Sequence, residues 1–169
     1  MKRSSRGFTL VEVAVAIAII GSLAGLVSLS ISSVFSSRAR RCAEEIDAYI
    51  SMCRINTMSK ANPDTIRLIL DSDDKGRIRV RYYEDGEEKD AAVFSESNMT
   101  AEYTIGDITT QLSNYNPLTL SFDRSTGGFK PQAYIDGEPV YCTSIIITSG
   151  RSYVIVLTPS TGNHYVSRG

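Results

Sequence analysis

One carboxylate stands out because of its surroundings. Glu12 is the only charged residue between Phe8 and Phe35, in a run that contains no proline. A charged carboxylate deep in hydrocarbon costs on the order of 3 kcal/mol, and such residues are usually paired or functional. No cation lies one or two helical turns away from it. Glu12 therefore either reaches back to the membrane surface or pairs with a cation that the uncut helix lacks.

The residues before this run supply such a cation if the chain is cut. The basic leader Met1–Gly7 ends at a glycine, and Phe8 opens the apolar run. Cleavage after Gly7 would leave a new ammonium group on Phe8, about one helical turn from Glu12. On a neighbouring subunit, the same ammonium would meet the carboxylate after an axial shift. We therefore expect Glu12 to pair with an N-terminus.

The segment Arg6–Val13, with the sequence RGFTLVEV, resembles the class III signal of type IV pilins and type II secretion pseudopilins. In that family a prepilin peptidase cuts after the glycine, here Gly7, and methylates the new N-terminal residue, here Phe8. The glutamate, here Glu12, neutralises a neighbouring subunit's N-terminus during assembly. The resemblance implies a structural subunit, whose partners are the prepilin peptidase, other pilin or pseudopilin subunits and an assembly platform in the inner or cytoplasmic membrane.

The apolar run is long enough to cross a membrane. As a helix, residues 8–35 would extend about 42 Å, whereas a hydrocarbon core is about 30 Å thick. The run is about twice as long as the apolar part of a signal peptide, and no small-x-small cleavage site follows it. Lys2, Arg3 and Arg6 favour a cytoplasmic N-terminus, with the C-terminal domain outside. We expect a retained single-pass helix, and a pilus or pseudopilus location after processing.

Two features favour a minor subunit. Many major pilins have a proline in the second half of the apolar segment, whereas residues 21–29 contain none. In addition, residues 118–128 and 154–162 are similar to the tail of the H-type minor pseudopilin and FimT group, in which a Thr-Gly turn joins the last two strands.

The helical pattern continues after Phe35 with a single apolar face. Residues on this face recur at steps of three and four: Phe35, Ala39, Cys42, Ile46, Ile50, Cys53 and Thr57. The pattern ends at Asn62-Pro63, because proline disfavours the helical conformation of the residue before it. One helix from Phe8 to Ala61 would be about 80 Å long.

From Asp64 onward the apolar residues alternate with polar ones. The alternation predicts strands near residues 65–70, 77–82, 92–95, 101–105, 118–123, 129–135, 141–148, 152–158 and 163–167. Short strands separated by Gly, Asp and Ser turns indicate antiparallel sheets, which the amphipathic half-helix would cover. We expect an α+β pilin fold with four parts: a cleaved leader (1–7), a transmembrane assembly helix (8–35), its amphipathic continuation (36–62) and a β head (63–169).

The three cysteines, Cys42, Cys53 and Cys142, form no pair with metal-binding spacing. Cys42 and Cys53 would lie about 16 Å apart along a helix, and a disulfide needs Cα atoms within about 7 Å. Cys142 could instead pair with one of them, preferably Cys53. Three buried thiols is the equally supported alternative.

The distal region offers few other candidate sites. Arg67, Arg77, Arg79 and Arg81 could line a DNA-binding strand face, which gives the alternative function of a competence-type pilin subunit. However, residues 63–169 carry ten basic and fifteen acidic side chains, a poor composition for attracting nucleic acid.

We do not expect this protein to be an enzyme. His164, the only histidine, has no catalytic pattern around it, and no phosphate loop, dinucleotide motif or metal quartet is present. Asp71–Gly76 is expected to be a hairpin turn rather than a calcium loop, because Lys75 takes a ligand position. We expect no cofactor and no metal.

Overall fold

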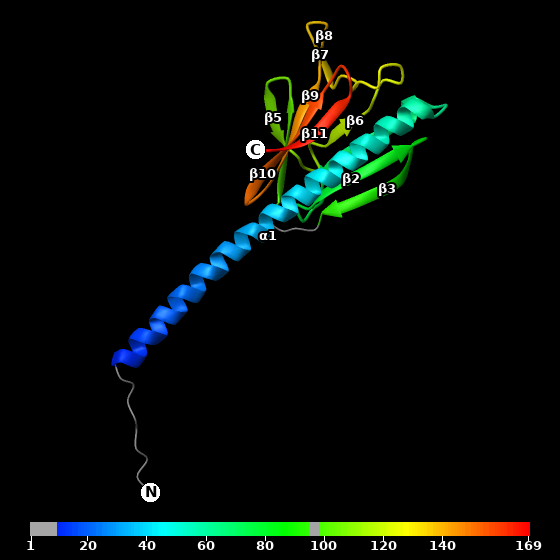
Figure 1. Cartoon of the computed structure of the whole chain (residues 1–169). Helices are drawn as coiled ribbons and strands as arrows, with labels where there is room; N and C mark the ends of the chain where they lie inside the picture. The colour runs from blue at the N-terminus through cyan, green and yellow to red at the C-terminus, as the bar shows by residue number, and fades with distance from the viewer. Residues whose placement is uncertain (1–9, 95–98) are drawn as a thin grey trace.

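The protein is one long helix packed along two antiparallel sheets, an α+β fold. The computed structural model describes residues 10–94 and 99–169, without the side chains of residues 23–36. Helix α1 runs from Leu10 to Ser59 without interruption, and its 50 residues extend about 75 Å. Its N-terminal half projects alone, whereas its C-terminal half lies against the β domain (Figure 1).

Helix α1 ends close to the position that its sequence predicts. The last helical residue is Ser59, two residues before Ala61, and the chain then bends. Asn62 has a non-helical backbone (φ −110°, ψ 70°), as expected for a residue before proline. Pro63–Thr65 form a short 3₁₀ turn, η1, that leads into the first strand.

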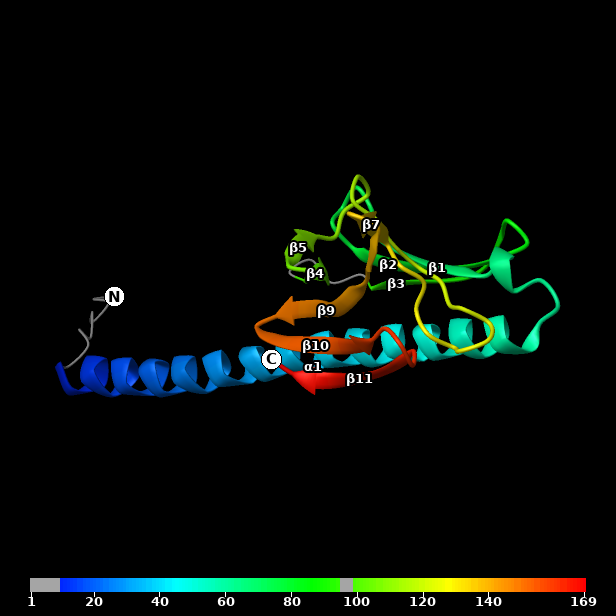
Figure 2. The ribbon, with the colours of Figure 1, turned by 90° about the horizontal axis from the view of Figure 1, so that it is seen from above.

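One face of the C-terminal half of α1 is part of the core. The buried residues on this face keep the predicted three- and four-residue spacing: Ala39, Cys42, Ala43, Ile46, Ile50, Cys53 and Thr57. They contact β9, β10 and β11 of one sheet and β1 and β2 of the other. Figure 2 shows α1 lying along β10 and β11. The amphipathic pattern of this half is therefore explained by packing.

The first sheet has the strand order β3-β2-β1-β6. Its strands are β1 (Arg67–Ser72), β2 (Ile78–Glu84), β3 (Glu87–Phe94) and β6 (Leu118–Leu120). All neighbours are antiparallel. Alternate side chains enter the core, and those of β1 and β2 are Leu68, Leu70, Ile78, Val80 and Tyr82.

The second sheet has the order β11-β10-β9-β4-β5, again antiparallel throughout. Its strands are β4 (Thr100–Ile105), β5 (Ile108–Gln111), β9 (Cys142–Ser149), β10 (Arg151–Thr158) and β11 (Asn163–Arg168). Buried Ile145, Ile147, Ile155 and Leu157 extend from this sheet into the core.

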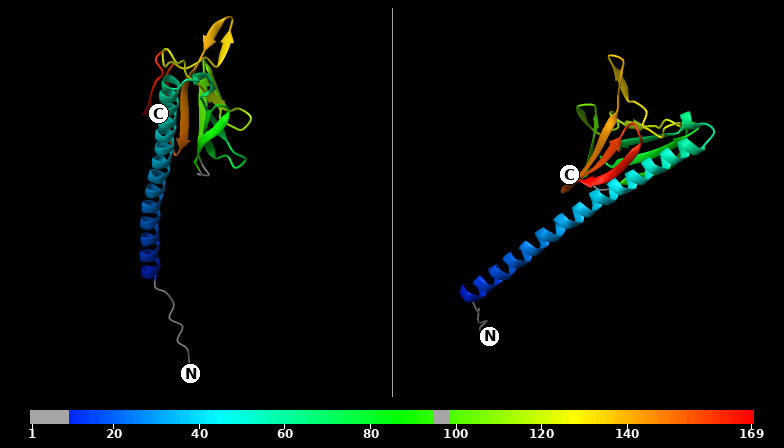
Figure 3. Two further views of the ribbon diagram at one scale, coloured as in Figure 1. Left: turned by 90° about the vertical axis from the view of Figure 1, so that its right-hand side faces the viewer. Right: turned by 45° about the horizontal axis from the view of Figure 1, so that its top comes forward.

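A separate two-stranded hairpin consists of β7 (Ala133–Ile135) and β8 (Glu138–Val140). We call residues 133–140 the finger. It projects from the end of the β domain farthest from the N-terminus of α1 (Figure 3, left). The strand pattern predicts one strand over residues 129–135. In the structure, the strand β7 covers only the last three of these residues, and Phe129 forms an isolated bridge with Phe122.

Candidate functional site

The predicted cleavage and methylation positions, Gly7 and Phe8, lie outside the described residues. Glu12 is described: it lies exposed in the first turn of α1. A carboxylate in the first turn interacts favourably with the partial positive charge of the helix N-terminus. The role of Glu12 in neutralising another chain's N-terminus stays a prediction, as do the cleavage and methylation.

The start of α1 presents large apolar side chains in all directions. Those of Leu10, Val11, Val13, Val15, Ile17, Ile19 and Ile20 are between 47% and 86% exposed. A helix that is apolar on every face is stable only when other apolar groups cover it. In the part of the chain that the structure describes, no helix combines the length and apolar character needed to cross a membrane.

All three cysteines are free thiols buried in the core, which is the second of the two alternatives, and the possible Cys53–Cys142 disulfide is not formed. The Cys53 and Cys142 thiols lie among different partners: Cys53 beside the Thr57 hydroxyl, and Cys142 within 3.6 Å of the Ser144 carbonyl. Burial raises the pKa of both thiols to about 12, and it also raises that of Cys42. Neutral, buried thiols are poor nucleophiles and poor metal ligands.

The predicted basic stripe is largely neutralised by nearby carboxylates. Asp71, although on the face of β1 away from the helix, is only 3% exposed. It accepts two hydrogen bonds from Arg79, at 2.8 and 3.1 Å, and another from Arg81. Arg77 pairs in the same way with Asp73 in the β1–β2 turn. The register that places Asp71 opposite Arg79 thus builds an internal ion network.

The network extends along the same sheet face. Arg81 also donates to the Tyr83 hydroxyl at 2.7 Å, and that hydroxyl donates to Glu88 at 3.0 Å. Arg67 stacks over the Tyr83 ring, 5.3 Å from its centroid. Since the guanidinium groups of β2 already contact carboxylates, they are poorly placed to bind the phosphates of a nucleic acid.

His164 connects the end of the chain to α1. Its side chain is 6% exposed, and Nδ1 lies 2.9 Å from the Gly162 carbonyl oxygen. A carbonyl only accepts, so Nδ1 carries the proton in the neutral ring and Nε2 accepts from the Ser51 hydroxyl at 2.8 Å. Asp47 Oδ1 lies 3.9 Å from Nε2, and burial raises the pKa of the Asp47 carboxyl. The arrangement fastens the β10–β11 turn to the helix.

Two similar turns meet at the far end of α1. The Ser-Thr-Gly sequences at 125–127 and 160–162 lie against each other, and the Arg54 guanidinium donates to Gly127 O at 3.0 Å and to Thr161 O at 2.7 Å. A Cβ on Gly162 would lie only 1.8 Å from the Gly127 oxygen. The sequence indicates each turn separately, but their contact through Arg54 depends on the fold.

Comparison with protein families gives one match. Residues 2–28 match the model of the prokaryotic N-terminal methylation motif, a segment that includes Gly7, Phe8 and Glu12. Neither the curated proteins nor the solved structures gave a match. The matched motif supports a type IV pilin-like protein that is a substrate of prepilin peptidase.

Proposed function

We propose that this chain is a structural minor pilin or pseudopilin subunit. Prepilin peptidase removes residues 1–7, cutting between Gly7 and Phe8, and methylates Phe8. The mature subunit then assembles through its N-terminal helix into a type IV pilus or a type II secretion pseudopilus. The observation that carries the proposal is the methylation motif at 2–28, joined to a helix with a bare apolar start and a second half built into an α+β head.

The proposal gives each part of α1 a role. Residues 8–35 anchor the unassembled subunit in the membrane, with the N-terminus in the cytoplasm and the head (63–169) outside. The same residues pack against other subunits in the filament, where Glu12 pairs with a neighbour's N-terminal ammonium. Residues 36–62 hold the head on this stem. The lack of proline at 21–29 and the Thr-Gly turn before β11 support a minor subunit of the H-type or FimT kind.

Mass spectrometry of the protein from its own cells tests the proposal. The expected mass lacks residues 1–7 and includes one methyl group on Phe8. An intact leader on all of the protein would overturn the proposal.

The Glu12 carboxylate is tested by two variants. Glu12→Ala and Glu12→Gln are expected to be cleaved normally, because the cut site is unchanged, but to enter filaments at least tenfold less. Glu12→Gln keeps the size and hydrogen-bonding capacity of the side chain, and so isolates the charge. Comparison of sheared filaments with the membrane fraction gives the incorporated share. Normal incorporation of Glu12→Gln would remove the pairing role.

A further inference from the structure

The imidazole of His164 lies in a nearly closed site between α1 and the β10–β11 turn. Its side chain is 6% exposed, and the Phe129 ring stands at 70° to it, with the two centroids 6.4 Å apart. In the neutral ring, Nδ1 donates to the Gly162 carbonyl at 2.9 Å and Nε2 accepts from the Ser51 hydroxyl at 2.8 Å. Both ring nitrogens are therefore satisfied while the ring carries no charge.

One oxygen beside the ring is not satisfied in that state. Asp47 Oδ1 is buried, and no residue that the structure describes donates a hydrogen bond to it. A buried acceptor without a donor costs stability. The oxygen lies 3.9 Å from His164 Nε2, which has no hydrogen to donate in the neutral ring. A proton on Nε2 would supply both the missing donor and a charge opposite to that of the carboxylate.

The spacing of Asp47 and Ser51 places both side chains within reach of the same ring nitrogen. They are four residues apart on α1, so they lie on the same side of the helix. A hydrogen bond between nitrogen and oxygen is about 2.9 Å long, so the ring and the carboxylate need to approach by about 1 Å. The Ser51 hydroxyl can keep its contact with Nε2 in either state, because it both donates and accepts.

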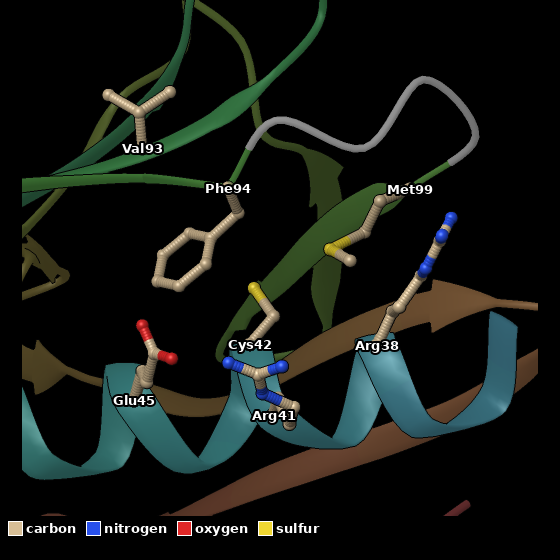
Figure 4. Close-up of a pocket in the computed structure, with 7 residues that line it drawn as sticks. All are labelled: Arg38, Arg41, Cys42, Glu45, Val93, Phe94 and Met99. Carbon is tan, nitrogen blue, oxygen red and sulfur yellow. The ribbon is translucent and has the colours of Figure 1, made fainter. Parts of the chain in front are cut away.

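The other charged groups on this part of α1 are engaged or point elsewhere. Arg54, one turn beyond Ser51, donates to two backbone carbonyls of the adjoining turns. Glu44 pairs with Arg40 at 2.8 Å. The Glu45 carboxylate points toward the end of β3, on the side of the helix where Phe94 lies (Figure 4).

The turns and strands around the ring offer it no free carboxylate among the described residues. Leu157 lies opposite His164 in the β10–β11 register, and it is apolar and buried. The turn that contacts Gly162 carries Asp123, whose carboxylate accepts hydrogen bonds from Ser125 and Thr126. Asp47 is thus the carboxylate available to the ring.

We propose that Asp47, Ser51 and His164 form a proton-operated clasp, in which protonation of His164 fastens the β10–β11 turn more tightly to α1. The neutral ring is held to the helix by the Ser51 hydroxyl, and the charged ring also pairs with the Asp47 carboxylate. The proton comes from water, and its loss returns the ring to the neutral arrangement. Histidine ordinarily changes charge between pH 5 and 8, so the clasp responds near neutral pH. It acts within the head and goes beyond the proposed function, on which it does not depend.

The clasp makes the head most stable in mild acid. A group whose charged, protonated form gains a partner on folding contributes stability that is complete at low pH and is lost as the pH rises through its titration. Burial raises the pKa of the Asp47 carboxyl, so at still lower pH the carboxylate takes up its own proton and the pair is lost. The expected stability therefore passes through a maximum on the acid side of neutrality.

A double-mutant cycle at two pH values tests the clasp. Asp47→Asn, which keeps the shape of the side chain, His164→Gln and the double variant are unfolded with urea as the detergent-solubilised full chain. At pH 5.5 the two substitutions are expected to be coupled by about fivefold in the folding equilibrium constant, and at pH 8 by less than about twofold. Absence of coupling at pH 5.5, or equal coupling at both pH values, would overturn the proposal.

Glu44→Gln is the matched control. It removes a carboxylate from the same helix, but one that pairs with Arg40 at an exposed position. It should show no coupling to His164→Gln at either pH. Coupling as large as that of Asp47→Asn would reveal a general charge effect along α1 and would overturn the clasp.

Hydrogen exchange in the unchanged chain gives an answer even if the variants do not fold. The Gly162 amide donates to Thr158 O in the β10–β11 turn, and its protection should be greater at pH 5.5 than at pH 8 once intrinsic exchange rates are corrected. The Gly76 amide, bonded to Asp73 O in the β1–β2 turn, is the control and should be equally protected at both. Equal protection of Gly162 at the two pH values would refute the clasp.

Discussion

Asp71 determines what the neighbouring arginines Arg79 and Arg81 do in the fold. In the sequence, Arg79 and Arg81 alternate on a strand and indicate a basic stripe. In the structure, both guanidinium groups contact the buried Asp71 carboxylate of the adjacent strand. An arginine that neutralises a buried carboxylate cannot leave it without a large cost, because the carboxylate would remain uncompensated. The stripe therefore stabilises the head, and the competence-type alternative loses its main support.

The environment of the Asp123 carboxyl predicts that the head loses stability in acid. Hydrogen bonds from the Ser125 hydroxyl and from the Thr126 amide and hydroxyl hold the pKa of its carboxyl at about 2, below the ordinary 3.8. The depressed pKa contributes stability that is complete above pH 3.8 and is lost as the pH falls toward 2. The melting temperature of the detergent-solubilised chain is expected to fall over this interval.

Asp123→Asn should make that fall shallower, because the side chain no longer titrates. Asp136→Asn, at an exposed position on the finger, is the matched control and should leave the slope unchanged. If Asp123→Asn and the unchanged chain have the same slope from pH 4 to pH 2, the hydrogen-bonded carboxylate is not the source of acid sensitivity.

The cysteines give a second prediction at this scale. Their burial and raised pKa values should prevent reaction with an alkylating reagent at pH 8 while the head is folded. Without reductant, mass spectrometry is expected to count no labelled thiol in the folded chain and three in the denatured chain. A single labelled thiol after denaturation would instead show that two of the cysteines form a disulfide.

At the scale of the elements, the contact between the two Ser-Thr-Gly turns restricts which residues can replace Gly162. Gly162 has a φ of +68°, and an added Cβ would overlap the Gly127 carbonyl. We expect Gly162→Ala to lower the free energy of unfolding by about 3 kcal/mol, at the upper end of the cost of local backbone strain, because the turns must also separate. Denaturant unfolding of the detergent-solubilised chain measures this loss.

Gly137→Ala is the matched control. Gly137 has a similar positive φ of +84°, but an added Cβ there meets no atom within 4 Å. It should therefore lose only about 1 kcal/mol, the cost of the left-handed backbone. Equal losses for the two variants would show that backbone strain, not the contact between the turns, determines the effect.

The elements also show what a sequence pattern can predict. The helix and its buried face follow from a long 3.6-residue period, and β9 and β10 follow from clear alternation. Strand β3 begins with four charged residues, Glu87–Asp90, and β5 is short and polar, so neither resembles a half-buried strand. Both are edge strands, where charge and polarity are compatible with pairing on one side only.

The functional residues likewise include some that a sequence pattern predicts and some that it does not. Gly7, Phe8 and Glu12 lie within six residues of one another in the sequence, so a local motif is sufficient to predict them. The contact between the two Ser-Thr-Gly turns was not predicted, because it is defined by three-dimensional position: Arg54 of α1 joins Gly127 to Thr161.

For the whole molecule, the proposed function gives α1 two roles: its start would join subunits, and residues 39–57 hold the head. Loss of the Glu12 charge should therefore reduce entry into the filament without unfolding the head, which packs on residues 39–57 of α1.

The continuity of α1 has a mechanical consequence. The same rod that projects from the head also lies along both of its sheets, from residue 39 to residue 57. Force applied to the projecting end acts parallel to that contact, in shear, so the buried side chains along the rod resist together rather than one after another. A filament built from such subunits can therefore transmit tension through its heads without first peeling them from their stems.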